Sequence, residues 1–366
     1  MKQFKDMRSL CLKIIFLVLN KYEDQDFGSG FWDLFFKSVK PLINRFKQEG
    51  SSSEKQSSLF FCFLAMSQSQ NLISLLFREN NLIPDIISIL SVPTASEAIV
   101  FSVLKFTENL LNLELEIGIG KNDVREVLLS SLDVLIDSLH HLFHLNPEKK
   151  RYVSSLACDK PNVCMEALKI LKEIIPVLGC ENTSKILNAV SPILISARLD
   201  VRLSVCDLCD ALTESDSSLR SMSNLIRELN ATSAMEIDAL DFDTIINAYD
   251  QISEDYFKGV REDQAIVILS HCIFDMMSED LTLRQRAYGS LLSFIDFSAL
   301  LVGNKEKNQE QQIMAVDGIS WTDAHIQRIV DKFLLKHMGD AISIETMMRK
   351  VCFGLRLPCE ILVDDV

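Results

Sequence analysis

The stretch Ala189-Val-Ser-Pro-Ile-Leu-Ile-Ser-Ala-Arg-Leu-Asp-Val-Arg-Leu-Ser-Val-Cys-Asp-Leu-Cys-Asp-Ala-Leu-Thr213 decides the fold, because it has the pattern of two helices joined by a tight turn. Pro192 lacks a backbone donor and should bend the first helix. Asp200 stands where the second helix needs an N-cap. The second helix carries apolar residues at helical spacing on one face, namely Val201, Val205, Leu208 and Leu212. Its other side carries Asp207, Asp210 and Glu214. Such a pair cannot bury its apolar face alone, so it predicts similar pairs beside it.

Aspartates with this placement recur along the chain, each just before a stretch with helical periodicity. They are Asp159, Asp200, Asp241 and Asp280. Their separation of about 40 residues is that of two-helix HEAT or armadillo units. Asp200 and Arg202 also form the Asp-x-Arg pattern that can form a ladder between adjacent HEAT repeats. The sequence therefore predicts an all-α fold, a HEAT/armadillo-like helical-repeat solenoid of the α-α superhelix type.

The composition agrees with an almost purely helical chain. Of the 366 residues 48% are hydrophobic, and only 12 are glycine and 8 proline, too few for the many turns of an all-β protein. The apolar run 265–269 could be a strand on local grounds. We assign it to a buried helix because its apolar pattern continues through Cys272, Ile273 and Met276.

The formal net charge is −14, and so acidic a surface does not attract nucleic acid through its general field. Three basic stretches could make local contacts, although each has the composition of a solvated helix face or loop. They comprise Lys2, Lys5, Arg8 and Lys13; Lys37, Lys40, Arg45 and Lys47; and Lys149, Lys150 and Arg151. We therefore expect any RNA contact to be local and secondary to protein contacts.

The ten cysteines lie mostly in apolar helical patterns and lack the regular spacing of a disulfide framework. We expect them to be reduced and buried, as in a nuclear or cytosolic protein. The apolar segment 10–19 resembles a signal-peptide core, but Lys13 interrupts it and no small-residue cleavage site follows. No apolar run is long enough to cross a bilayer, so no membrane partner is expected.

We expect one continuous HEAT-like repeat array over residues 1–340 and a divergent C-terminal tail over 341–366. Polar loops interrupt the array near 50–58 and 303–312. Helices are predicted over 2–22, 31–46 with a bend at Pro41, 59–67, 70–79, 83–90, 96–113, 124–145, 322–338 and 344–351. Such an array can expose an apolar face at either end, here at 1–19 or 344–362, and we expect that face to promote self-association.

Three patterns suggest chemistry, and each has a simpler explanation. Cys206 and Cys209 form a CxxC pair, but they lie within a helix and no second ligand pair stands at zinc-site spacing. A histidine group without the glutamate of the HExxH motif consists of His140, His141 and His144. The segment Gly118-Ile-Gly-Lys121 lacks the first glycine and the Ser or Thr of a phosphate-binding loop.

The sequence carries no catalytic set of a familiar class. We predict no catalytic, cofactor-binding or metal-binding residue, no cofactor, no small-molecule substrate and no enzymatic activity. Aromatic clusters such as Phe31, Trp32, Phe35 and Phe36 continue the apolar periodicity. Their expected role is helical core rather than stacking on bases.

Several segments, taken in order, resemble one known family. They are Phe31-Trp-Asp-Leu-Phe-Phe-Lys-Ser-Val-Lys-Pro-Leu-Ile43, Phe46-Lys-Gln-Glu-Gly-Ser-Ser-Ser-Glu-Lys55, Ile193-Leu-Ile-Ser-Ala-Arg-Leu-Asp-Val-Arg-Leu203, Leu229-Asn-Ala-Thr-Ser-Ala234, Ile268-Leu-Ser-His-Cys272, Leu283-Arg-Gln-Arg-Ala-Tyr-Gly-Ser-Leu-Leu-Ser-Phe294 and Lys332-Phe-Leu-Leu-Lys-His-Met-Gly339. No single motif is specific, and the ordered series from 27 to 339 carries the resemblance. The chain is similar to the family of small-subunit processome component 20, also called the down-regulated-in-metastasis (DRIM) family, and most similar to its plant members.

The resemblance implies a non-catalytic HEAT-type scaffold in the nucleus, within the nucleolus, that supports pre-rRNA processing and small ribosomal subunit biogenesis. It implies other processome proteins and the small nucleolar ribonucleoprotein as partners, with local contact to pre-rRNA. Family members are far longer than this chain, so an internal or truncated fragment is expected. The sequence departs from the family pattern after residue 341.

Two other functions stay open on the residues alone. A different helical-repeat adaptor, such as a transport receptor or a kinase-associated scaffold, would suit the acidic balance, because its inner surface could bind basic peptides. A hydrolase or transferase would need a cluster of ionisable groups with shifted pKa values in a pocket.

Overall fold

The computed structural model describes residues 2–22, 27–49, 57–79, 81–92, 95–117, 131, 133–138, 161–176, 182–233, 239–305 and 321–329. Every element named in this part of the chain is a helix, and its β pairing is limited to an isolated antiparallel bridge between Thr232 and Leu240. The predicted all-α fold is confirmed. Most of the predicted helices at 124–145 and 322–338, and all of 344–351, lie outside the described residues.

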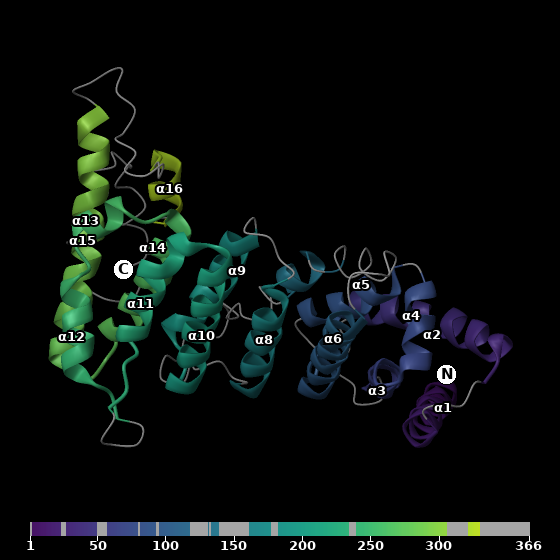
Figure 1. Ribbon diagram of the computed structural model, residues 1–366. Helices are drawn as coiled ribbons and strands as arrows, with labels where there is room; N and C mark the ends of the chain where they lie inside the picture. Colours follow the sequence, from purple (N-terminus) through teal and green to yellow (C-terminus); the bar gives the residue numbers. More distant parts are fainter. Residues whose placement is uncertain are drawn as a thin grey trace. The chain divides into compact units, whose positions relative to one another are not determined.

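The chain forms two compact units, each of which is a run of packed helices (Figure 1). The first comprises Met1–Ser154 and Cys158–Gly179, and the second comprises Ser155–Ala157 and Cys180–Val366. Many of the packed pairs within each unit are near neighbours in the sequence, as in a helical-repeat protein, although α14 of the second unit also packs on α9 and η5 from much earlier in the chain. The single continuous array over residues 1–340 stays a prediction.

The first unit is built around α3 and α6. It contains α1 (Lys2–Lys21), α2 (Ser29–Glu49), α3 (Ser57–Ser67), α4 (Gln70–Arg78), α5 (Leu82–Ile87), the 3-10 helix η2 (Ser88–Ser91), α6 (Glu97–Ile117) and α8 (Pro161–Ile174). Helix α3 packs against α1 and α6, and α6 packs against α8. Because α3 is apolar around most of its circumference, it is covered on more than one side.

Aromatic side chains of α2 and α3 form much of the core of this unit. Trp32 and Phe35 are buried with their ring centroids 5.9 Å apart, edge to face. The Phe35 ring also lies 6.2 Å from that of Phe63. These contacts confirm that the aromatic cluster is helical core. Helix α2 continues through Pro41 to Glu49, beyond its predicted end.

An ion-pair network joins α6 to α8. Lys105 Nζ lies 2.7 Å from Glu108 and 2.6 Å from Glu166 of α8. Lys169 of α8 in turn binds Glu108. Glu108 is buried, and two lysines therefore compensate its desolvation.

The second unit is built around one buried helix. It contains α9 (Thr183–Val190), the 3-10 helix η5 (Ser191–Ile195), α10 (Leu199–Ser215), the 3-10 helix η6 (Ser217–Leu219), α11 (Arg220–Glu228), α12 (Phe242–Asp250), α13 (Glu254–Lys258), α14 (Glu262–Met276), α15 (Leu281–Lys305) and α16 (Asp323–Gln327). Helix α14 packs against α15, α9, η5 and α11, and 11 of its 15 residues are buried. The assignment of 265–269 to a buried helix is confirmed. Residues 303–305 of the polar loop predicted near 303–312 belong to α15, which extends to Lys305, and the rest of that loop lies outside the described residues.

The stretch that decided the fold forms α9, η5 and α10, with one difference at each junction. Pro192 lies near the start of η5, so the α-helix ends at Val190 instead of bending. Helix α10 begins at Leu199 with Arg198 at the N-cap, and the predicted N-cap at Asp200 is wrong. Asp200 lies in the first turn, where a carboxylate stabilises the positive end of the helix dipole.

The predicted faces of α10 are confirmed. Its apolar face is buried throughout and consists of Val201, Val205, Leu208 and Leu212. On the other side, Arg227 of α11 binds Asp207 at 2.7 Å and also Asp210. The acidic side of α10 therefore helps to hold α11.

Two of the other predicted N-caps are confirmed. Asp241 accepts a hydrogen bond from the backbone of Thr244 at 3.2 Å, and Asp280 accepts one from Leu283 at 2.9 Å. Asp159 lies outside the described residues.

No single described helix is both long and apolar enough to span a membrane, although a bent pair, Ser58–Ser67 with Asn71–Arg78, passes the same test by length and composition.

Candidate functional site

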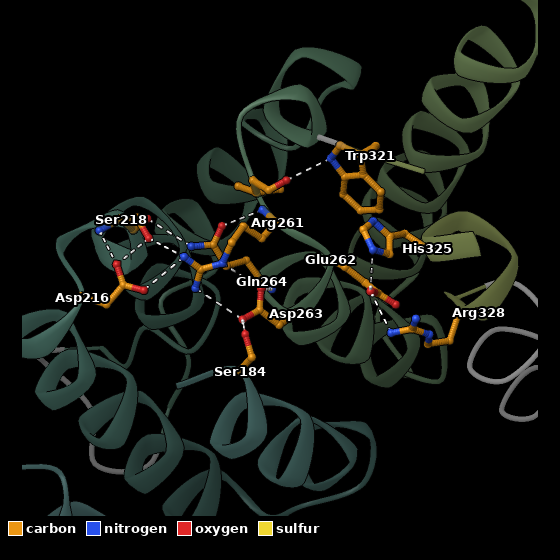
Figure 2. Close-up of polar contacts among 11 residues, drawn as sticks. Ser184, Asp216, Ser218, Arg261, Glu262, Asp263, Gln264, Trp321, His325 and Arg328 are labelled. Atoms are coloured by element: carbon orange, nitrogen blue, oxygen red, sulfur yellow. Dashed lines mark hydrogen bonds and ion pairs between the residues drawn. The ribbon is translucent and has the colours of Figure 1, made fainter. Parts of the chain in front are cut away.

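The densest polar cluster of the second unit lies at the N-terminus of α14 (Figure 2). The local sequence Arg261-Glu-Asp-Gln264 builds it. Gln264 Oε1 accepts a hydrogen bond from the backbone N–H of Arg261 at 2.8 Å, which fixes the first turn. Glu262 and Asp263 add negative charge where the helix dipole is positive.

Arg261 is the centre of this cluster, which we call the Arg261 clamp. Its guanidinium donates to Asp216 at 3.1 Å and Ser218 at 2.8 Å, both before α11, and to Asp263 through Nε at 3.2 Å. Ser184 of α9 donates to Asp263 at 2.6 Å. One side chain thus joins α14 to the η6 turn, and through Asp263 to α9.

The clamp also lowers the pKa of one of its acids, Asp216. Partial burial favours the neutral form of Asp216, but hydrogen bonds from Ser218 and the charge of Arg261 outweigh that effect and lower the pKa of Asp216. Asp216 is therefore ionised at neutral pH and matches the cation.

Glu262 points the opposite way, toward the segment 321–329 (Figure 2). Arg328 Nη1 donates to Glu262 at 3.1 Å, and His325 lies 3.8 Å away. Burial raises the pKa of Glu262, although Arg328 and His325 oppose that shift. Arg328 and His325 therefore hold the segment 321–329 to the start of α14 through the carboxylate of Glu262, which is partly desolvated.

Trp321 anchors the same segment. Its indole Nε1 donates to the carbonyls of Phe257 and Val260, both at 3.0 Å. Its ring packs 5.3 Å from that of Phe297 on α15. The clamp and this anchor fasten five elements around the start of α14, which is a structural task and needs no bound group.

A second polar cluster is buried deeper along α14. Tyr249 of α12 donates to Asp275 at 2.6 Å, and His271 Nε2 lies 3.1 Å from Asn230 Oδ1. Arg202 of α10 stacks over the ring of Phe274 at 3.9 Å. The predicted Asp-x-Arg pattern thus places Arg202 in the core, while Asp200 instead pairs with Arg198 at 3.0 Å.

Burial dominates the titration of this second cluster. It raises the pKa of Asp275 to about 6, although the hydrogen bond from Tyr249 and the charge of Arg202 oppose the shift. It lowers the pKa of His271, and Arg202 lowers it further, so His271 is neutral at pH 7. The Tyr249 hydroxyl lies beside both groups, 2.6 Å from Asp275 and 3.4 Å from His271 Nδ1, but all three side chains are buried and burial raises the pKa of Tyr249. We therefore assign the cluster to packing between helices.

The residues that sequence motifs indicated as candidate metal, phosphate or RNA sites are either structural or lie outside the described residues. Cys206 and Cys209 are fully buried, and burial raises the pKa of Cys206 to about 12. No group of metal-ligating side chains large enough to hold an ion occurs in the described part of the chain. The histidine group at 140–144, the glycine segment at 118–121 and the basic stretch at 149–151 lie outside it.

Two of the four basic residues in the stretch on α2 are paired with acids. Lys40 pairs with Glu79 at 2.5 Å, and Lys47 pairs with Asp85 at 2.7 Å. Because two of its four cations are compensated in this way, the stretch is weaker as a site for phosphates than its composition alone would make it.

The residues of the Arg261 clamp and the Trp321 anchor were not singled out by sequence reasoning. One local signal was available, because a run of Arg, Glu, Asp and Gln directly before a buried apolar helix is an N-terminal capping pattern. The partners Asp216 and Trp321 carry no such signal, since they are 45 and about 60 residues away in the sequence.

Comparison with known proteins gives one strong match. The model of a family described as U3 small nucleolar RNA-associated protein 20, N-terminal, matches residues 1–160 and 158–343. A search of curated proteins found no match. The family match agrees with the resemblance inferred from the ordered segments, and it covers both structural units.

Proposed function

Because the chain belongs to the family of U3 small nucleolar RNA-associated protein 20, we propose that it is a non-catalytic nucleolar scaffold of the small-subunit processome. In that role it supports pre-rRNA processing and biogenesis of the small ribosomal subunit. The observation that carries the proposal is the family match, which extends over residues 1–343. The family is that of a processome component.

The helical architecture suits a supporting scaffold better than it suits an enzyme. Stacked helices present long surfaces whose shape depends on fixed packing between neighbours. The Arg261 clamp, the Trp321 anchor and the Lys105–Glu108 network each tie helices together with ionised or buried groups. Side chains that are already committed to one another hold a surface in shape, which is what a scaffold requires.

In this proposal the chain binds mainly to proteins, and its contacts with pre-rRNA are local and secondary. The net charge of −14 opposes a general attraction to RNA. Lys40 and Lys47, two of the basic residues of α2, are paired with carboxylates. The expected partners are other processome proteins and the small nucleolar ribonucleoprotein.

Purification of the tagged chain from nuclear extract, with and without ribonuclease, tests this order of contacts. We expect processome proteins to be retained after RNA digestion, quantified by mass spectrometry against a tag-only control. If those proteins are absent and transport or kinase-associated proteins co-purify instead, the chain is a different helical-repeat adaptor and the proposal is wrong.

A further inference from the structure

Helix α1 is apolar on two opposite faces, and only one of them is covered. Leu12 and Leu19 are buried on the side that faces the rest of the first unit. There the Phe16 ring lies 5.6 Å from that of Phe61 on α3. On the opposite side the large apolar residues are exposed: Met7 by 62%, Leu10 by 58%, Ile14 by 52% and Leu17 by 62%. We call these four residues the α1 stripe.

The α1 stripe has the geometry of a helix-docking seam. Its members follow one another at separations of three, four and three residues, the spacing of the a and d positions of a heptad. Together they expose on the order of 400 Å² of apolar surface, a patch of a size that is often functional on a monomer. Other exposed large apolar residues in the described chain are scattered, for example Leu34 and Leu300.

The charge beside the stripe is positive. From Met7 to Lys21, α1 carries Arg8, Lys13 and Lys21 and no acidic residue. No described carboxylate pairs with these cations; Lys21 lies over the ring of Tyr22 at 5.6 Å. The contrast with α2 is direct, because there Lys40 and Lys47 are neutralised. On a chain of net charge −14, the part of α1 from Met7 to Lys21 therefore joins uncovered apolar surface to cations that no described carboxylate pairs with.

We propose that the α1 stripe docks an amphipathic helix of a protein partner whose apolar face is flanked by Asp and Glu. In such pairing the apolar residues interdigitate, and charges at the flanking positions select the partner. Lys13 flanks the stripe and would meet an acidic residue of that helix. Lys21 extends the same face by one turn and would meet another.

Charge also argues against a second copy as the occupant, although the sequence led us to expect self-association through this face. In an antiparallel pair of α1 helices, Met7 would face Leu17 and Leu10 would face Ile14. The two copies of Lys13 would then lie close together, which is unfavourable.

This inference rests on the proposed scaffold function only in that it names one kind of protein partner. The test therefore uses purified components. The full chain is titrated into a fluorescent synthetic peptide of the same length as α1, 20 residues, with Leu and Ile at the a and d positions and Glu at the flanking positions. A matched peptide with Lys in place of Glu is the charge control.

We expect the acidic peptide to bind and the basic peptide not to bind. The double variant Leu10→Gln/Ile14→Gln should weaken binding at least tenfold, and Lys13→Glu should weaken it several-fold. Leu34→Gln, which removes an equally exposed apolar side chain from α2, is the matched control and should leave binding unchanged. Circular dichroism of each variant checks that the helix content is retained.

Three results would overturn the inference. The first is acidic-peptide binding that the Leu10→Gln/Ile14→Gln variant leaves unchanged. The second is that the acidic peptide does not bind to the chain. This holds even if anionic phosphatidylserine vesicles or single-stranded RNA bind through α1. The third is light scattering that shows a dimer which the double variant dissolves. None of these results bears on enrichment of processome components from nuclear extract, so the two proposals fail separately.

Discussion

Arg261 joins three parts of the second unit because a guanidinium presents five donors in a rigid planar fork. Its Nη1 reaches Asp216 and Ser218 while Nε reaches Asp263. The side chain of Asp263 is only 6% exposed, and Arg261 is the cation that pairs with it. At the residue scale, the packing of α9, η6 and the start of α14 therefore depends strongly on the single side chain of Arg261.

Replacing Arg261 by alanine should lower the free energy of unfolding by about 2–3 kcal/mol, because it leaves buried Asp263 without its cation. Arg286→Ala is the matched control. Arg286 pairs with Asp250, and about half of each side chain is exposed, so the loss should stay below ~1 kcal/mol. Urea denaturation followed by circular dichroism measures both. Equal losses in the two variants would contradict the role of the clamp.

Asp275 should make stability depend on pH. Its pKa is about 6 in the folded chain and about 3.9 when unfolded. Between those values the unfolded chain loses this proton while the folded chain keeps it, so stability falls as pH rises across the window. The total loss is on the order of 3 kcal/mol. His271 acts in the opposite sense, because its folded pKa is depressed and its contribution is lost as pH falls below about 6.5.

The variant Asp275→Asn removes the pH dependence that comes from Asp275 and keeps the one that comes from His271. Relative to the wild type, its unfolding free energy should rise between pH 4 and pH 6 and then level off. Urea titrations at half-unit pH steps give that difference directly. Parallel pH profiles for the two proteins would show that Asp275 does not hold a proton at pH 5.

Cysteine reactivity should follow burial. Burial raises the pKa of Cys62 and of Cys206 to about 12, so both stay as inert thiols. Cys11, by contrast, is exposed on α1. Brief treatment of the native chain with iodoacetamide, read by peptide mass spectrometry, should modify Cys11 and spare Cys62 and Cys206. Rapid modification of Cys206 would mean that α10 opens readily.

Single residues also show where sequence reasoning reaches its limit. Asp241 and Asp280 were predicted as N-caps and are N-caps, because that bond is local. The prediction of Asp200 as an N-cap was wrong, because the sequence was compatible with a helix start before or after Asp200. Helix α10 begins at Leu199, with Arg198 at the N-cap. The burial of Arg202 against Phe274 depends on a helix about 70 residues away, and no local pattern encodes such a contact.

At the scale of elements, Trp321 helps to hold the short helix α16 against the rest of the second unit, together with the contacts of Arg328 and His325 to Glu262. Its indole donates to two carbonyls at the α13–α14 corner, and its ring packs against Phe294 and Phe297 of α15. The segment 321–329 contains a helix of only 5 residues, too short to be stable without such contacts.

The variant Trp321→Phe should keep the ring contacts and lose both hydrogen bonds, at a cost of about 2 kcal/mol. Amide hydrogen exchange should become faster in residues 321–329 and at the start of α14. Trp32→Phe is the control, because Trp32 is also buried but its Nε1 has no hydrogen-bond partner in the described structure. Its local exchange should change much less. Equal acceleration in both variants would rule out the anchor.

The helices themselves were largely predictable, since their apolar periodicity is strong. The predicted ranges 59–67 and 70–79 match α3 and α4 within about two residues, the usual uncertainty of helix ends. The predicted helix 31–46 already ran through Pro41, and α2 ends three residues beyond that range, at Glu49. Which helix lies at the centre was not predictable in detail, because burial of α14 on all sides depends on packing with α9, α11 and α15.

At the scale of the whole molecule, charge and packing point to one kind of task. The chain carries a net charge of −14, many of its described helices pack against near neighbours in the sequence, and its clusters of ionised groups tie helices together. The feature that departs from this pattern is α1, with its exposed stripe and with Lys13, which pairs with no carboxylate among the described residues. A scaffold needs both kinds of surface, fixed shape along its length and docking faces for its partners.

The most direct measurement is the amount of rRNA precursor that co-purifies with the tagged chain from nuclear extract at moderate salt. Processome membership predicts enrichment of the small-subunit precursor over the large-subunit precursor, relative to a tag-only control. Equal recovery of the two precursors, or none of either from a soluble and folded chain, would contradict the account.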